Sequence, residues 1–92
     1  MRSLALLLAL ATLLVLASSA GAVTRECREI SATVGAIKAK NVTCKRARKV
    51  VKAHSTGTET PFGFSCIDQR YEGGVTFKCR KGDQRVIYSR AD

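Results

Sequence analysis

The chain has 92 residues, which allows one domain at most. Its 16 lysine and arginine residues outnumber 7 aspartate and glutamate residues, giving a formal net charge of +9. The seven acidic residues are scattered, which argues against the paired carboxylates of glycosidase-like chemistry. A strongly basic chain is suited instead to anionic partners.

Residues 1–22 have the three parts of a signal peptide. A single positive charge at Arg2 precedes an apolar stretch of 14 residues, and the segment ends in small side chains. A membrane-spanning helix needs about 20 apolar residues, so the stretch is too short for an anchor. We expect cleavage before Val23, or alternatively after Ala20. The product is then a single small secreted domain, residues 23–92, with no membrane span.

The secreted part keeps 15 basic and 7 acidic residues, so its net charge is +8 (15 − 7). A domain of this size buries only about 60% of its unfolded surface and needs further stabilisation. An even number of cysteines in an exported chain predicts two disulfide bonds among Cys27, Cys44, Cys66 and Cys79. A zinc site would need closely spaced ligands, and His54 is the only histidine. We therefore expect neither a metal nor a cofactor.

The N-terminal part of the secreted domain is predicted to contain one or two short strands. Residues 23–29 are polar and are expected to form an arm held down at Cys27. Apolar residues alternate with polar ones over residues 30–34, which indicates a strand. The alternation then slips by one residue at Gly35, which predicts a bulge or a tight turn.

From Cys44 to about His54 the period becomes helical, and Thr43 is a plausible N-cap. One side of this helix is apolar and the other is basic. Lys45 and Arg46 lie near the positive end of the helix dipole, a choice that helix stability does not explain. The basic face consists of Lys45, Arg46, Arg48, Lys49 and Lys52.

After a loop over residues 55–63, the chain is predicted to form three antiparallel strands. Phe62, Phe64 and Cys66 alternate with polar residues, as do Val75, Phe77 and Cys79. Turns are expected at residues 72–74 and 81–83, before a last strand over residues 85–89. The sequence therefore predicts an α+β fold with one helix packed on a small antiparallel sheet.

Four cysteines allow three pairings. We place Cys44–Cys66 with Cys27–Cys79 first, because joining helix to sheet across the 55–63 loop removes the most chain entropy. The arrangement Cys44–Cys79 with Cys27–Cys66 comes second. A Cys66–Cys79 bridge would join strands that the hairpin already holds together, so it ranks last.

Three short motifs resemble a group of small exported, largely uncharacterised bacterial proteins. They are Cys44 with Ala47-Arg48, Gly63-Phe64-Ser65-Cys66, and Cys79-Arg80-Lys81-Gly82. The resemblance implies export and a four-cysteine α+β domain. It brings no catalytic residue and no ligand.

We do not expect an enzyme. His54 would have to serve any Ser/His or Cys/His mechanism, but it ends the apolar helix face, where packing or capping is the commoner role. No catalytic residue is predicted.

The sequence favours a non-enzymatic secreted or envelope-associated binding domain whose basic helix face meets an anionic partner, such as a cell-envelope polymer. Solubilising charge is an equal interpretation of that face. Nucleic acid is disfavoured, because few aromatic residues accompany the charges and no known binding module is visible. The alternative is a secreted inhibitor or antimicrobial effector on the same scaffold, with Ser55–Pro61 as its only candidate loop. A protein partner stays open.

Overall fold

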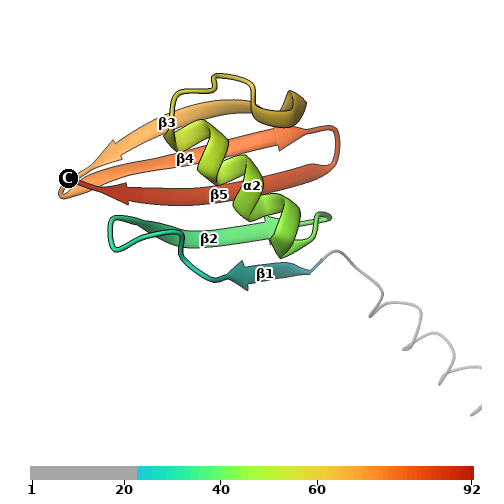
Figure 1. The fold of residues 1–92 in the computed structure, drawn as a ribbon, viewed down its shortest axis with the longest axis horizontal. Coiled ribbons are helices and arrows are strands. Elements are labelled where there is room, and N and C mark those ends of the chain that lie inside the picture. The colour runs from blue at the N-terminus through green and yellow to red at the C-terminus, as the bar shows by residue number, and fades with distance from the viewer. Residues whose placement is uncertain (1–22) are drawn as a thin grey trace, which may run out of the picture.

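The computed structural model describes residues 23–92, so the signal-peptide prediction for residues 1–22 lies outside the described residues. Figure 1 shows an antiparallel sheet with one long helix lying across one of its faces. The sheet has the order β1-β2-β5-β4-β3, which makes the last strand the central one. This architecture confirms the predicted α+β class. The elements are β1 (Thr24–Cys27), β2 (Val34–Lys40), α2 (Cys44–Ser55), a 3-10 turn (Pro61–Gly63), β3 (Ser65–Tyr71), β4 (Gly74–Lys81) and β5 (Gln84–Ala91).

The C-terminal half is the predicted three-stranded meander. Strands β3 and β4 pair in continuous register, as do β4 and β5. Each turn contains a glycine with positive φ, Gly73 at 100° and Gly82 at 58°, a conformation that side chains disfavour. Gly74 is required for a different reason, because a Cβ there would lie 2.4 Å from the carbonyl oxygen of Arg90. Both predicted hairpin turns are confirmed.

The one-residue slip predicted at Gly35 is a β-bulge within a single strand. Gly35 pairs with Ser89 and Lys38 pairs with Ile87, so two residues of β2 lie opposite one residue of β5. Ala36 takes a left-handed φ of 52° in the bulge. The bulge restores the phase in which the next apolar residues face the helix.

Two predictions for the N-terminal segment are wrong. The polar arm is in fact an edge strand, β1, which pairs antiparallel with β2 and buries little of its side-chain surface. Residues 30–33 form a turn rather than a strand, in which the Ser31 hydroxyl accepts a hydrogen bond from the Val34 amide at 3.1 Å. An antiparallel β1-β2 pair needs such a reversal of the chain between its strands.

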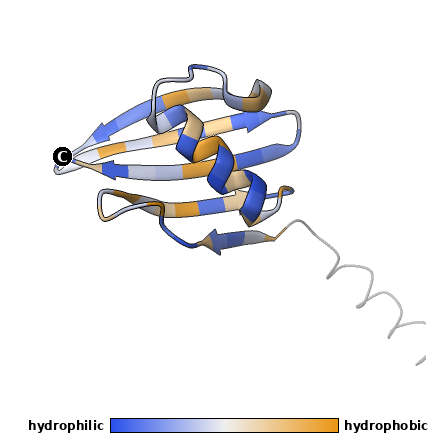
Figure 2. Ribbon diagram, viewed as in Figure 1, coloured by the Kyte–Doolittle hydropathy of each residue, from blue (hydrophilic) through white to orange (hydrophobic). Residues whose placement is uncertain are grey.

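The helix matches its predicted bounds to within one residue. The Thr43 hydroxyl accepts a hydrogen bond from the Arg46 amide at 3.2 Å, which confirms the predicted N-cap. Hydrophobic and hydrophilic residues alternate along α2 in Figure 2. The hydrophobic core lies between the helix and the sheet. It includes Ala47, Val50 and Val51 from α2, Ile37 from β2, Val86 and Tyr88 from β5, and Phe64 before β3.

The predicted disulfide pairing is wrong. Cys27 is bonded to Cys44, with 5.4 Å between their Cα atoms, and Cys66 is bonded to Cys79, with 4.0 Å. The second pair are direct cross-strand partners on β3 and β4. The first pair meets because β1 brings Cys27 under the first turn of α2. Geometry therefore decides the pairing, since bridged Cα atoms must lie within about 7 Å.

Phe62 departs from the alternation that the sequence indicates. It has a φ of 53° inside the 3-10 turn and is 47% exposed, while its neighbours Pro61 and Phe64 are buried. The left-handed backbone at Phe62 turns its side chain outward, between two buried neighbours. Phe62 therefore belongs to the surface rather than to the core.

Candidate anionic-partner surface

The basic residues of α2 lie on the side of the helix that faces away from the sheet. Ala47, Val50 and Val51 are buried against the sheet, and the helical period turns the intervening residues outward. Lys45, Lys49 and Lys52 are exposed, whereas Arg48 is half-buried. The predicted separation of an apolar and a basic helix face is therefore present.

Four of the five predicted residues line one groove, here called the helix groove. Lys45, Arg48, Lys49 and Lys52 form it together with Ile30 from the turn before β2, and its volume is about 470 Å³. Within residues 23–92, no carboxylate lines this groove. The groove therefore gathers positive charge without internal neutralisation.

Arg48 also has a structural role in the wall of the helix groove. Its Nε donates to the carbonyl oxygen of Arg28 at 3.1 Å, and its Nη2 approaches that of Glu29 at 3.4 Å. These contacts tie the helix to the segment that follows β1. The guanidinium is held by these bonds, whereas the three lysines donate no hydrogen bond among the described residues.

Arg46 lies apart from the other four. Its guanidinium carbon is 5.2 Å from the centre of the Phe62 ring, which suits a cation–π contact. It lines a separate depression of about 320 Å³ that also includes Lys81. The five residues predicted to act together therefore divide into a groove of four and one stacked arginine.

His54 lies in the last turn of α2 and packs against the sheet. Its Nδ1 lies 2.6 Å from the Tyr88 hydroxyl, and its ring meets the Phe77 ring edge-on at 4.9 Å. Burial, with a smaller contribution from the charge of Arg90, lowers the pKa of His54 below 6.5. Burial likewise raises the pKa of Tyr88 to about 12, although Arg90 acts in the opposite direction. Both groups are therefore uncharged in the folded protein near neutral pH.

The histidine also lies beside a disulfide. Ligand-capable atoms of His54, Cys66 and Cys79 all lie within 4.8 Å of one another. The two sulfur atoms are bonded to each other, so neither is the thiolate that zinc requires. In this oxidised state the cluster is a packed contact between the helix and the β3-β4 hairpin.

The loop considered for an inhibitor is attached to the end of the helix. The Thr56 hydroxyl donates to the carbonyl oxygen of Lys52 at 2.9 Å, and the Thr58 amide donates to that of Ala53 at 3.0 Å. Residues 56–60 are exposed and Pro61 is buried. The loop therefore caps the end of α2 through Thr56 and Thr58, and residues 56–60 remain exposed to solvent.

Further cations on the strands were missed in the sequence. They occupy alternate positions next to buried residues, so each lies on the sheet face opposite the helix. The signal was the alternation of charge with apolar residues in each strand. These cations are Lys38, Lys40, Lys78, Arg80 and Arg85.

Comparison with protein-family models, with curated proteins and with solved structures finds no match for this chain. The resemblance to small exported bacterial proteins therefore stays a prediction. Among residues 23–92, no helix combines the length and the apolar character needed to cross a membrane.

Proposed function

We propose that residues 23–92 form a non-enzymatic, secreted or envelope-associated domain that binds an anionic polymer in the helix groove. The observation that carries the proposal is the convergence of Lys45, Arg48, Lys49 and Lys52 on one groove lined by no carboxylate of the described chain. A linear polyanion would meet several of these charges at once. Its affinity would then come mainly from charge and would fall with salt.

The spacing of these cations supports binding over structural stabilisation. They stand at positions i, i+3, i+4 and i+7, so each neighbouring pair on the helix surface carries the same charge. Like charges four residues apart destabilise a helix by roughly 0.2–0.5 kcal/mol per pair. Lys45 also lies in the first turn, where the helix dipole disfavours a cation. Helix stability therefore gains nothing from this arrangement, whereas an anionic partner would offset its cost.

Secretion is supported by the oxidised cysteines. Two disulfides and no free cysteine are present in residues 23–92, and such bonds persist in oxidising compartments outside the cytoplasm. The anionic polymers of a cell envelope would be accessible to a domain in that location.

The test uses the disulfide-bonded domain and sodium polyphosphate as the anionic probe. Lys45→Glu with Lys49→Glu reverses two charges of the helix groove, and Arg25→Glu with Arg70→Glu makes the same charge change at exposed positions outside it. We expect the groove variant to lose at least about tenfold more affinity than the control at moderate salt. Both variants should keep the wild-type melting temperature closely. Equal losses in the two variants would reduce the groove to general solubilising charge.

A further inference from the structure

The sheet has a second face, opposite α2, which no helix or strand of the described chain covers (Figure 1). Side chains alternate between the two faces of a strand. Ile37, Cys79 and Val86 are buried beneath the helix, so the residues next to them point the other way. We call this surface the open sheet face. Its cations and aliphatic side chains are Lys38, Lys40, Ile67, Lys78, Arg80, Arg85 and Ile87.

The strand register arranges the open sheet face in two rows. Lys38, Ile87, Lys78 and Ile67 are successive cross-strand partners, from β2 through β5 and β4 to β3. In the neighbouring row the partners are Lys40, Arg85 and Arg80. Directly opposed side chains have Cβ atoms roughly 4.5–5.5 Å apart. The first row therefore alternates cations with aliphatic side chains, and the second, here called the cationic row, has three cations in succession.

The cationic row opposes the stability of the sheet, because like charges placed directly opposite destabilise a strand pair. Three cations on the helix side behave differently. Arg48 donates to two carbonyl oxygens, Lys81 donates to that of Phe62 at 3.1 Å, and Arg90 lies over the Phe77 ring at 5.4 Å. Those charges are used within the fold.

The charges of the open sheet face are almost unused within the fold. Arg85 reaches the carbonyl oxygen of Gly82 at 3.5 Å, and among the described residues the other four cations donate no hydrogen bond. Glu26, paired with Lys38 on the edge strand, is the one carboxylate that the register of residues 23–92 places on this face. Five cations are therefore available to an external partner of opposite charge.

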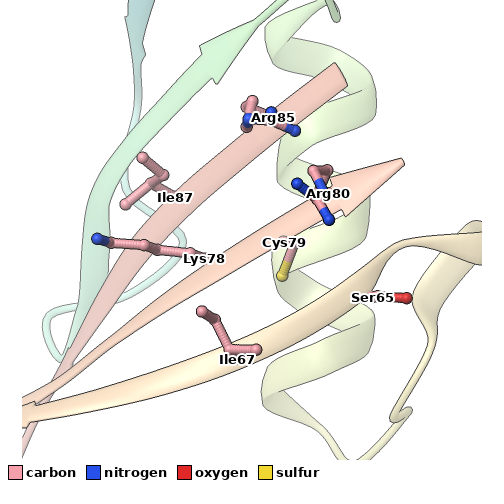
Figure 3. A pocket seen from close by; sticks show the side chains of 7 residues that line it. All are labelled: Ser65, Ile67, Lys78, Cys79, Arg80, Arg85 and Ile87. Atoms are coloured by element: carbon pink, nitrogen blue, oxygen red, sulfur yellow. The ribbon is translucent and has the colours of Figure 1, made fainter. Parts of the chain in front are cut away.

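The isoleucines show what kind of partner this is. Ile67 is 68% exposed, and Ile87 lies half-buried between Lys38 and Lys78. A shallow groove of about 430 Å³ passes over Ile67 and Ile87, and Figure 3 shows both side chains flanking Lys78. Arg80 and Arg85 lie beside them in the same view. The partner must offer negative charge and apolar contact together.

We propose that the open sheet face docks on an anionic lipid bilayer. Lysine and arginine side chains would meet phosphate headgroups, while Ile67 and Ile87 would enter the boundary between headgroups and acyl chains. The face is a broad sheet surface, which suits a plane better than a single strand of polymer. Nucleic acid fits less well, because base stacking needs aromatic side chains close to the cations. Tyr71 ends β3, whereas the cationic row lies beside Ser65 at the start of that strand.

The proposal concerns a different surface and a different partner from the helix groove. The helix and the open sheet face lie on opposite sides of the sheet (Figure 1). A domain docked through its sheet would direct the helix groove away from the bilayer. Both surfaces can then be occupied at once, by lipid on one side and by polymer on the other.

The test measures co-sedimentation of the disulfide-bonded domain with vesicles containing about one-third phosphatidylglycerol in phosphatidylcholine, and with vesicles of phosphatidylcholine alone. Lys78→Glu with Arg80→Glu reverses two cations of the open sheet face, and Lys45→Glu with Lys49→Glu makes the same charge change in the helix groove. The first variant also places a carboxylate opposite Arg85, so its fold should be retained. Ile67→Ser removes apolar contact and leaves every charge in place.

We expect binding to the anionic vesicles only, falling at least about thirtyfold in the Lys78/Arg80 variant. Binding should fall about fivefold in Ile67→Ser and no more than a few-fold in the helix variant. Absence of binding to anionic vesicles, or equal losses in the two charge variants, would overturn the proposal. Unchanged vesicle binding by Ile67→Ser, together with complete displacement of the domain from vesicles by polyphosphate, would also overturn it. That result would show that the open sheet face is a site for a soluble polymer. Polyphosphate binding by the helix groove is measured separately, so each proposal can fail without the other.

Discussion

The Nδ1 atom of His54 lies 2.6 Å from the hydroxyl oxygen of Tyr88, joining the end of α2 to the central strand β5. Phe77 completes the cluster, with its ring stacked on that of Tyr88 at 4.8 Å. The guanidinium of Arg90 lies over the Phe77 ring, with its carbon 5.4 Å from the ring centre. A neutral imidazole fits this site, because a charged one would lose hydration and face the guanidinium.

Stability should therefore depend on pH through His54. Burial, and to a smaller extent Arg90, holds the pKa of His54 in the folded protein below 6.5, its value when unfolded. The unfolded chain thus binds a proton more readily than the folded one, so the free energy of unfolding falls as the pH drops. The contribution is fully present above about pH 6.5 and is lost as the pH falls through the folded-state pKa. Urea unfolding at a series of pH values measures this slope.

The control for this slope is His54→Gln, which keeps a polar side chain of similar reach but does not titrate. Carboxylates titrate equally in both proteins, so the difference between the two curves isolates the histidine. We expect the curves to converge toward low pH. Parallel curves from pH 8 to the acid range would show that His54 has the same pKa in both states.

Thr43→Ala should destabilise the domain by about 1 kcal/mol. The Thr43 hydroxyl accepts from the Arg46 amide at 3.2 Å, and no acidic residue in the first turn assists it. Thr60→Ala is the matched control, because Thr60 caps the 3-10 turn without a side-chain hydrogen bond. Thermal unfolding should show a clear fall for the first variant and little change for the second. Equal effects would assign the loss to general packing.

The sequence predicts best those elements whose buried apolar residues recur at a regular spacing. The helix was identified because Cys44, Ala47, Val50 and Val51 recur at the helical period and are its inward residues. The strands of the meander were identified because one face of the sheet is buried and one is open. The bulge was visible as a slip in the same alternation at Gly35.

Sequence reasoning failed where the burial or exposure of a residue does not follow from a repeating apolar pattern. Ile30 packs against the core from a turn, so its apolar character suggested a strand that does not exist. The edge strand β1 leaves no alternation to detect, because most of its side chains are exposed. Its position is set by backbone pairing to β2 and by the Cys27–Cys44 bond, which are properties of the folded chain.

The disulfide pairing was missed for a related reason. Chain entropy favours bonds that close long loops, whereas the observed bonds have sequence separations of only 17 and 13 and contribute about 3 kcal/mol each, so loop length favoured an arrangement that the chain does not adopt. The register of the β3-β4 hairpin selects the observed pairing, because Cys66 and Cys79 are direct partners. The basic set on the helix was likewise found from periodicity, whereas the division between the helix groove and Arg46 depends on contacts with Phe62.

Non-reducing tryptic mapping should recover the observed bonds as two linked peptides. Basic residues separate all four cysteines in the chain, so cleavage leaves each in a different fragment. We expect the fragment 26–28 joined to 41–45, and the fragment 53–70 joined to 79–80. A linked pair containing Cys44 and Cys66 would contradict the structure.

Removing the first bond should loosen one strand selectively. Cys27→Ala with Cys44→Ala should lower the free energy of unfolding by about 3 kcal/mol. Strand β1 has four residues and, among the described strands, pairs with β2 alone, so its amides should then exchange with solvent fastest among these strands. Cys66→Ala with Cys79→Ala is the comparison, since β1 should stay protected in it. Hydrogen exchange read by mass spectrometry distinguishes the two variants.

Ala36→Gly should stabilise the domain, although glycine usually weakens a strand. Ala36 is exposed and holds a left-handed φ of 52° in the β2 bulge, a conformation that costs a residue with a Cβ roughly 1–2 kcal/mol. Glycine removes that cost but adds freedom to the unfolded chain, which offsets about 0.5–1 kcal/mol of the gain. We therefore expect a net increase of about 0.5 kcal/mol, or a few degrees in Tm. The contrasting variant is Ala53→Gly within α2, where φ is helical and the same change should cost about 1 kcal/mol. A loss in Ala36→Gly as large as that in Ala53→Gly would show that the methyl group of Ala36 contributes more to the bulge than its backbone conformation costs.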